Sequence, residues 1–174
     1  MIENKRIIIR PMQEDDLDAV MVIDRLSFSL PWPESAYRHD LFDNSNALLR
    51  VAEDSDNQSR GLILGLIDVW LILDEAHIAT IAVHPDYRNQ GIATKLIEAV
   101  LLEAEGKGAC KAMLEVRTSN QAAQTLYQKF GFQVVHRRRK YYIDNKEDAL
   151  LMNLDNLTEW VKSSELIKAR KVLS

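Results

Sequence analysis

The chain has 174 residues, of which 47% are hydrophobic and 28% charged, so it fits one soluble globular domain and not a disordered segment. Its formal net charge of −4 lacks the basic excess on which nonspecific nucleic-acid binding depends, and nucleic acid is not expected as a ligand. The lone cysteine, Cys110, excludes an intramolecular disulfide and a cysteine-rich zinc site, and it favours a reducing, cytoplasmic setting.

No segment is expected to target or cross a membrane. Residues 1–11 carry several charges and no long apolar stretch, unlike a signal peptide. The most apolar window, residues 62–73, is interrupted by Asp68 and falls short of the roughly 20 residues that span a bilayer. We expect that window to form a buried strand.

The first part of the chain predicts a strand, a helix, a loop and a second helix. Residues 6–10 have a strand pattern, and the acidic residues 14–16 favour the first turn of a helix that runs to about Phe28. The positions at helical spacing in this helix are Leu17, Val20, Met21 and Asp24. The Pro-Trp-Pro sequence at residues 31–33 interrupts the pattern, and residues 34–42 follow as a short helix.

The middle of the chain predicts three strands. Residues 47–53 and 62–73 are apolar, and the turn-forming residues 54–61 join them as an antiparallel pair. Residues 76–83 form the next strand, which Pro85 ends.

The second half predicts an alternation of helices and strands. Apolar spacing and closing glycines predict a helix at residues 91–107. The elements that follow are a strand at 112–117, a helix at 121–130, a strand at 132–142 and a strand at 149–153. Strand, helix, strand alternation predicts locally parallel pairing. A terminal helix is suggested by Leu157, Trp160, Val161, Leu166 and Ile167.

The turn before the helix at residues 91–107 has the features of a phosphate site. Helix N-termini leave backbone N–H groups without partners and carry about half a positive charge. Gly91 lets the backbone approach an anion closely, and Arg88 adds a formal charge. A plain strand-to-helix turn has the same features, so the residues alone leave both interpretations open.

Two runs of residues resemble the conserved halves of the GNAT acetyltransferase superfamily. The run Arg88-Asn89-Gln90-Gly91-Ile92-Ala93 is similar to the family's acyl-CoA motif, with Ala93 in place of the commoner final glycine. The second half of the likeness is carried by Leu114-Glu115-Val116-Arg117, Ser119-Asn120, Ala123, Leu126-Tyr127 and Phe130-Gly131-Phe132. A more specific likeness, to ribosomal-protein-alanine N-acetyltransferases and related N-terminal acetyltransferases, is carried by Tyr141-Tyr142, Glu147-Asp148-Ala149 and Met152.

The resemblance covers about residues 6–154 and implies the α/β (α+β) GNAT fold. That fold has a mixed, mostly antiparallel central sheet with helices on both faces, and a locally parallel, splayed pair of strands that binds acyl-CoA. We expect residues 1–154 to form the acetyltransferase domain. Residues 155–174 are expected to form a helical extension, packed on the domain or in a dimer contact, of a monomer or homodimer.

The resemblance also assigns residues to the two substrates. It implies that acetyl-CoA is bound by Ile81, Ala82, Val83, Arg88, Asn89, Gln90, Gly91, Ile92, Ala93, Thr94, Asn120 and Tyr127. It implies acceptor contacts at Pro31, Trp32, Tyr141 and Tyr142. Leu30 stands where the family has an aromatic residue before the proline, which bears on the fine specificity for the acceptor.

Glu115 is the candidate general base. In the strand at 112–117 it shares one face with Met113 and Arg117, and a carboxylate in mid-strand must be paired or placed at an opening. The structural alternative is an ion pair with Arg117. Burial is expected to raise the pKa of Glu115 toward that of a useful base. The resemblance implies the catalytic role.

Tyr127 lies two helical turns after Asn120, so both side chains can address one groove. It could equally be a core aromatic residue of its helix. The resemblance implies that Tyr127 is the general acid that protonates the departing CoA thiolate. Asn120 would cap the helix, contact the cofactor, or do both.

The remaining candidate groups predict no metal site and no covalent intermediate. The four histidines, His39, His77, His84 and His136, lack metal-ligand spacing, and only His84 lies beside the cofactor loop. Cys110 precedes a buried strand and is expected to act as a small hydrophobe, which disfavours an acyl-cysteine. The basic run at residues 137–140 is expected to be a solvated strand face, with attraction of an acidic substrate as the alternative.

The function expected from the resemblance is transfer of acetyl from acetyl-CoA to the N-terminal α-amine of a protein, by direct attack in a ternary complex. A peptide α-amine has a pKa of about 8 against about 10.4 for lysine, so it needs less deprotonation work. A ribosomal protein is one candidate acceptor. The alternatives are a GNAT enzyme that acetylates a small-molecule amine and a non-catalytic acyl-CoA-binding module.

Overall fold

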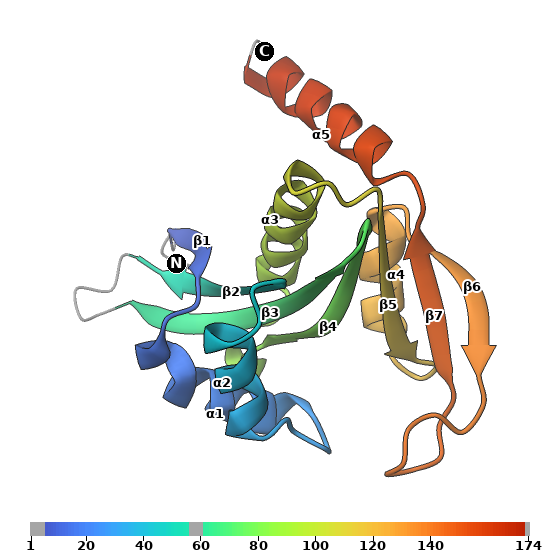
Figure 1. Ribbon diagram of the computed structural model, residues 1–174. Helices are drawn as coiled ribbons and strands as arrows, with labels where there is room; N and C mark the ends of the chain where they lie inside the picture. The colour runs from blue at the N-terminus through green and yellow to red at the C-terminus, as the bar shows by residue number, and fades with distance from the viewer. Residues whose placement is uncertain (1–5, 56–60, 173–174) are drawn as a thin grey trace. The chain divides into compact units, whose positions relative to one another are not determined.

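The computed structural model describes residues 6–55 and 61–172 (Figure 1). The strands are β1 (Ile7–Pro11), β2 (Ala47–Asp54), β3 (Leu62–Ile72), β4 (Glu75–Val83), β5 (Lys111–Arg117), β6 (Gln133–Arg138) and β7 (Ala149–Leu154). The helices are α1 (Leu17–Ser27), α2 (Glu34–Phe42), α3 (Ile92–Gly106), α4 (Gln121–Lys129) and α5 (Leu157–Val172), with short 3₁₀ turns at Glu14–Asp16 and Pro85–Tyr87. Within the described ranges, no helix has the length and apolar character needed to cross a membrane.

The strands form one mixed sheet in the order β1-β2-β3-β4-β5-β7-β6. Its antiparallel pairs include β1 with β2, β2 with β3, β5 with β7 and β6 with β7. The parallel pair is β4 with β5, in a register that runs from Glu75↔Lys111 to Ile78↔Leu114. The predicted antiparallel pair of residues 47–53 and 62–73 and the mixed, mostly antiparallel sheet are confirmed.

The last three strands differ from the sequence prediction. β7 lies between β5 and β6, so the strands on either side of α4 are not neighbours. The reason is composition: β7 is apolar and partly buried, while β6 is exposed at every position and suits a sheet edge. The predicted strand at 132–142 also ends early, at Arg138, because the chain turns at Lys140, whose φ is 52°.

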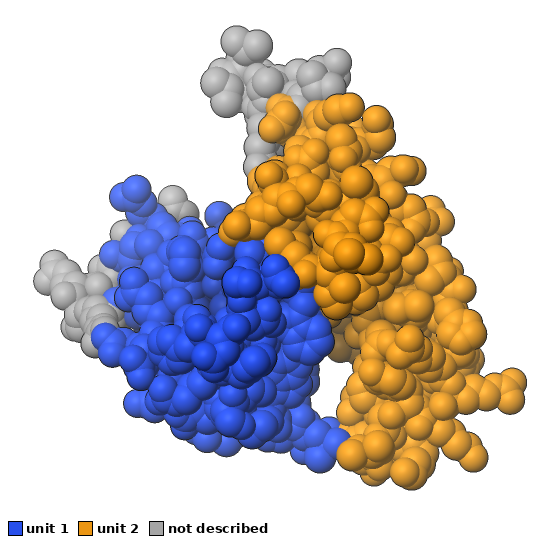
Figure 2. Space-filling view, in the orientation of Figure 1, with its two compact units in different colours: residues 1–70, 79–100 blue, residues 71–78, 101–174 orange. Residues whose placement is uncertain are grey.

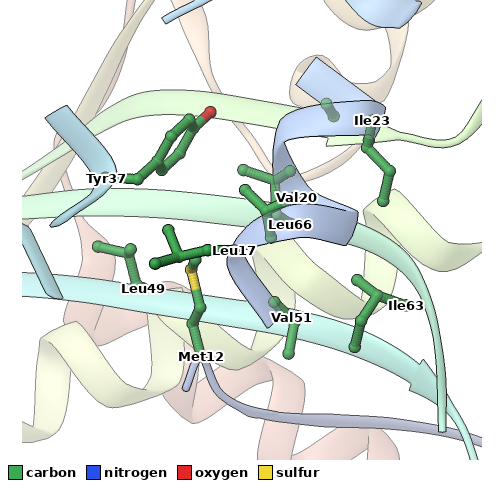
Figure 3. Packing of buried hydrophobic residues seen from close by; sticks show 10 residues of the cluster. Met12, Leu17, Val20, Ile23, Tyr37, Leu49, Val51, Ile63 and Leu66 are labelled. Atoms are coloured by element: carbon green, nitrogen blue, oxygen red, sulfur yellow. The ribbon is translucent and has the colours of Figure 1, made fainter. Parts of the chain in front are cut away.

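Contacts within the chain divide it into two compact units (Figure 2). The first comprises Met1–Trp70 and Ala79–Val100, and the second Leu71–Ile78 and Leu101–Ser174. In the first unit, α1 and α2 pack on the sheet over a buried apolar cluster (Figure 3). Its members are Met12, Leu17, Val20, Ile23, Tyr37, Leu49, Val51, Ile63, Leu66 and Ala82.

In the second unit, the start of α5 packs against residues near β5 and α4. Leu157 is fully buried and its N–H donates to the Cys110 carbonyl at 3.0 Å, while the Trp160 ring lies 5.7 Å from that of Phe130. The side chains of Leu166 and Ile167, also expected on the apolar face, lie outside the described residues. Cys110 itself is exposed, contrary to the expectation of a small buried hydrophobe, because the buried strand begins only after it.

Candidate active site

The turn before α3 holds a backbone conformation that favours glycine. Gly91 has a φ of 77°, in the left-handed region, and Asn89 has a φ of 61°. A Cβ added to Gly91 would meet no atom within 4 Å, so the position is open as well as left-handed. Glycine thus suits the backbone of this turn, and the space beside it is free for a ligand.

The first turn of α3 offers hydrogen-bond donors at this open position. The Gly91 carbonyl accepts the N–H of Lys95 at 3.1 Å, which sets the start of the helix, and the N–H groups of the first turn have no acceptor within the helix. Ile92 is buried and anchors the turn, whereas Thr94 is exposed. These donors and the helix dipole suit an anion.

Arg88 adds a positive charge to the same turn. Its Nε donates to the Val83 carbonyl at 3.2 Å and its guanidinium donates to the Ser27 hydroxyl at 3.4 Å. Both partners are neutral, so the guanidinium charge is not cancelled by them. The exposed side chains of Asn89 and Gln90 complete the predicted cofactor loop.

The end of β4, which carries Ile81, Ala82 and Val83, is held closely against β3. A Cβ on Gly65 would lie 2.8 Å from the Ala82 carbonyl oxygen, so β3 needs a glycine here to pack against β4. The N–H of His84 donates to the Leu64 carbonyl at 2.9 Å. The imidazole of His84 accepts from the N–H of Asp86 at 3.3 Å, so it caps the 3₁₀ turn that follows.

Glu115 lies on the half-buried face of β5, as its alternation predicts, and is paired with Arg138 of β6. One carboxylate oxygen lies 2.5 Å from the Arg138 guanidinium. Tyr141 is hydrogen-bonded to the same carboxylate, and this contact, followed by burial, raises the pKa of Tyr141. The alternative prediction, an ion pair of Glu115 with Arg117, was wrong, because Glu115 pairs with Arg138.

Arg117 instead binds the loop between β6 and β7. Its guanidinium donates to Asp144 at 2.8 Å and to Glu147 at 3.4 Å, and it lies 3.8 Å from the centre of the Tyr142 ring. Burial raises the pKa of Tyr142 to about 12, against the opposing charge of Arg117. Hydrogen bonds led by those of Ser119 lower the pKa of Glu147 to about 2. Ion pairs and hydrogen bonds therefore hold the loop that carries Tyr141 and Tyr142 against β5 and the turn that follows it.

Tyr127 is 5% exposed and packs against Phe132 at 6.0 Å, so it has the position of a core aromatic residue. Burial raises its pKa, and the phenol stays protonated at neutral pH. Asn120 is exposed and its side chain accepts the N–H of Ala123 at 3.1 Å, which confirms it as the cap of α4.

The Pro31-Trp32 loop divides into an exposed and a packed part. Pro31 is exposed, while the Trp32 ring lies between those of Tyr37 and Trp70, at 5.5 and 5.9 Å. The Trp32 side chain is thus partly buried and packs against the apolar core.

Among the predicted site residues, the structure brings Glu115 together with Tyr141, and Tyr141 with Tyr142, whose rings are 5.2 Å apart. The sequence marks Arg138 only as part of the basic run at residues 137–140, and Arg117 pairs with Asp144 and Glu147 instead of the expected alternative, Glu115. Strand β6, which carries the first part of this run, is solvated as expected. Even so, Arg137 forms an ion pair with Asp148, and Arg138 forms one with Glu115. Across residues 6–55 and 61–172, no group of three or more histidine, cysteine or acidic side chains could hold a metal ion.

Comparison with known proteins gives consistent matches. The profile of the Acetyltransferase (GNAT) family matches residues 17–132. A putative ribosomal protein bS18-alanine N-acetyltransferase of Bacillus subtilis is 38% identical over 83% of this chain and 92% of its own length. The corresponding Escherichia coli enzyme is 35% identical over 84% of this chain and 95% of its own length.

Solved structures agree in fold. The ribosomal-protein-S18-alanine N-acetyltransferase from Escherichia coli matches with a TM-score of 0.75 and 32% identity, over 86% of this chain and 93% of that one. A chain of the NatC complex bound to Gag peptide and CoA matches with a TM-score of 0.77 and 26% identity, over 86% of this chain and 98% of that one.

Proposed function

The chain belongs to the acetyltransferase (GNAT) family, and from this we propose that it transfers an acetyl group from acetyl-CoA to the α-amine of a protein N-terminus. The observation that carries the proposal is the turn at Gly91, which is open, left-handed and followed by the free donors of a helix start. The two bacterial relatives bear the name ribosomal protein bS18-alanine N-acetyltransferase, one of them as putative, and the match extends over most of both chains.

The residues at the start of α3 fit the diphosphate of acetyl-CoA. Backbone donors of residues 89–94 and the charge of Arg88 would meet its negative charge, and the missing side chain at Gly91 leaves room for it. Ile81, Ala82 and Val83 would line the pantetheine arm. Backbone N–H groups near Val83 would polarise the thioester carbonyl, the usual electrostatic contribution to acyl transfer.

The proposed reaction needs one base and one acid. Glu115 removes a proton from the incoming ammonium, directly or through water, and the free amine attacks the thioester carbon. The C–N bond forms as the C–S bond breaks, and Tyr127 gives its proton to the departing thiolate. The second proton that the nitrogen loses as the amide forms restores the Tyr127 phenol. A phenol whose pKa is raised by burial is protonated before the reaction, as an acid must be. Reaching the sulfur requires that the buried Tyr127 hydroxyl face the bound thioester.

The acceptor is proposed to be a protein N-terminus that begins with alanine, with a ribosomal protein as the first candidate, because the relatives carry that name. Pro31, Trp32, Tyr141 and Tyr142 are the proposed acceptor residues. Modification of a ribosomal protein would take place in the cytoplasm, where we place the enzyme. We propose residues 1–154 as the catalytic domain, with α5 as an extension.

A peptide screen tests this function. Purified protein and acetyl-CoA are mixed with peptides that begin with alanine, serine, threonine or methionine, and with an N-blocked peptide that contains lysine. Free thiol release and mass spectrometry report transfer. We expect turnover with free α-amines, alanine first, and less than about a tenth of that rate with the N-blocked peptide, because the lysine amine is protonated at neutral pH. Equal rates on the blocked peptide and the free α-amines would reject the proposal. So would the absence of thiol release with every peptide.

A further inference from the structure

Asp24 is a charged residue on the buried face of α1. Its side chain has no exposed surface, and both Val20, one helical turn earlier, and Ile23, next to it in the sequence, belong to the apolar cluster of Figure 3. An ionised carboxylate in such surroundings is costly unless donors satisfy it. Packing alone would favour an aliphatic residue here, so the acid needs another explanation.

Both carboxylate oxygens of Asp24 bind the chain that leaves α1. Oδ2 accepts the backbone N–H of Trp32 at 2.7 Å, and Oδ1 accepts the hydroxyl of Tyr37 at 2.8 Å. Burial raises the pKa of Asp24, and these two hydrogen bonds oppose that rise. The carboxylate thus joins the end of α1, the loop at residues 28–33 and the start of α2.

The ring of Trp32 is fixed by the same group of residues. It packs between Tyr37 and Trp70, at 5.5 and 5.9 Å, and the Trp70 indole N–H donates to Asp40 at 2.9 Å. Trp32 is therefore held through its backbone by Asp24 and through its ring by two aromatic neighbours. Leu30, two residues earlier, is 51% exposed, and Pro31 is exposed too.

We infer that Asp24 is a positioning residue for the acceptor: it fixes the loop through Trp32, so that Leu30 and Pro31 are presented to the acceptor chain. Trp32 is then the anchor of the loop. A loop that is already ordered loses less conformational entropy when it binds, which favours acceptor affinity. The inference rests on the proposed N-terminal acetyltransferase activity and names how that activity selects its acceptor.

Three variants separate this role from a merely structural one. Asp24→Ala removes both hydrogen bonds, and Asp24→Asn keeps one acceptor for the Trp32 N–H while its amide can donate to the Tyr37 hydroxyl. Asp16→Ala is the matched control, since Asp16 is also buried, borders the other end of α1, and binds Arg10 and the N–H of Gln13. Steady-state kinetics with an alanine peptide, acetyl-CoA titration and melting temperatures are measured for all three.

We expect Asp24→Ala to raise the KM for the peptide about tenfold, with kcat and acetyl-CoA affinity within twofold of wild type. Asp24→Asn should lie between wild type and Asp24→Ala. Asp16→Ala should lower the melting temperature without changing the peptide KM. An unchanged peptide KM in Asp24→Ala, or an equal rise in Asp16→Ala, overturns the inference while wild-type turnover still supports the function. Absence of wild-type turnover on every peptide overturns both.

Discussion

The turn at Gly91 and the cluster around Glu115 are built in opposite ways. The turn is exposed, and its chemistry is in the backbone: two left-handed residues, the first amides of α3 and one arginine. The cluster depends on side chains of β5, β6 and the following loop, which meet through ion pairs and ring contacts. One region needs the correct consecutive residues, and the other needs the correct fold.

The largest effect is expected from Glu115→Gln, which removes the proposed base and keeps the side-chain shape. General-base catalysis contributes about 10²–10⁴-fold, so kcat for an alanine peptide should fall at least about 100-fold. Acetyl-CoA affinity should stay within twofold, because the turn at Gly91 is unchanged. Stopped or continuous thiol assays at several pH values measure the first, and titration calorimetry the second. Wild-type rates in this variant would remove Glu115 from the chemistry.

A smaller effect is expected from Arg138→Gln. This change breaks the 2.5 Å ion pair with Glu115 and leaves the carboxylate less well positioned, so kcat should fall about tenfold. Arg138→Lys should recover part of the loss. The control is Arg137→Gln, on the same strand, which breaks an ion pair with Asp148 whose arginine is 62% exposed. Equal losses in the two glutamine variants would assign the effect to β6 as a whole.

The difference between the regions also explains what the sequence could predict. Helix α2 and the antiparallel β2–β3 pair follow from consecutive residues, and they were confirmed. The cap at Asn120 and the turn at Gly91 are equally local. The partner of Glu115 is 23 residues away on a strand that does not neighbour β5, so alternation within β5 pointed to Arg117. The position of β7 between β5 and β6 also depends on contacts between residues that are far apart in the sequence.

The sequence draws attention to two buried acids but does not predict their partners. Asp24 falls at helical spacing in α1 and Asp68 interrupts the apolar run of β3, so both could be noticed. Their partners could not, because Trp32, Tyr37 and Asp40 reach them only through the packing of α1 and α2 on the sheet.

The smallest effect, on stability and not on catalysis, is expected from Asp68→Asn. Burial and the neighbouring Asp40 raise the pKa of Asp68 from 3.8 to about 8. The folded protein therefore keeps this proton between about pH 4 and pH 8, where the unfolded chain has released it. The contribution of Asp68 to stability is fully present below about pH 4 and is lost as pH rises through about 8.

Asparagine has no proton to lose, and its amide can still donate to Asp40. At pH 8 the variant should be more stable than wild type by roughly 2 kcal/mol, or about 4–8 °C in melting temperature. The gap should shrink toward pH 5, and acetyl-CoA affinity should not change. Thermal melts across pH 5–9 measure this. A gap that is constant with pH would show that Asp68 does not carry the proton.

The proposed function depends on binding of the acetyl-CoA diphosphate by the start of α3 at Gly91. Its most direct test is a calorimetric titration of wild type, Gly91→Asn and Gly91→Asp with acetyl-CoA and with S-acetylpantetheine, which lacks the diphosphate. Both substituents tolerate a left-handed φ better than other side chains do, so their difference isolates charge. We predict that Gly91→Asp binds acetyl-CoA at least about tenfold more weakly than Gly91→Asn, with equal affinities for S-acetylpantetheine. Equal affinities of the two variants for acetyl-CoA, or an equal loss with S-acetylpantetheine, would show that the diphosphate does not bind at Gly91.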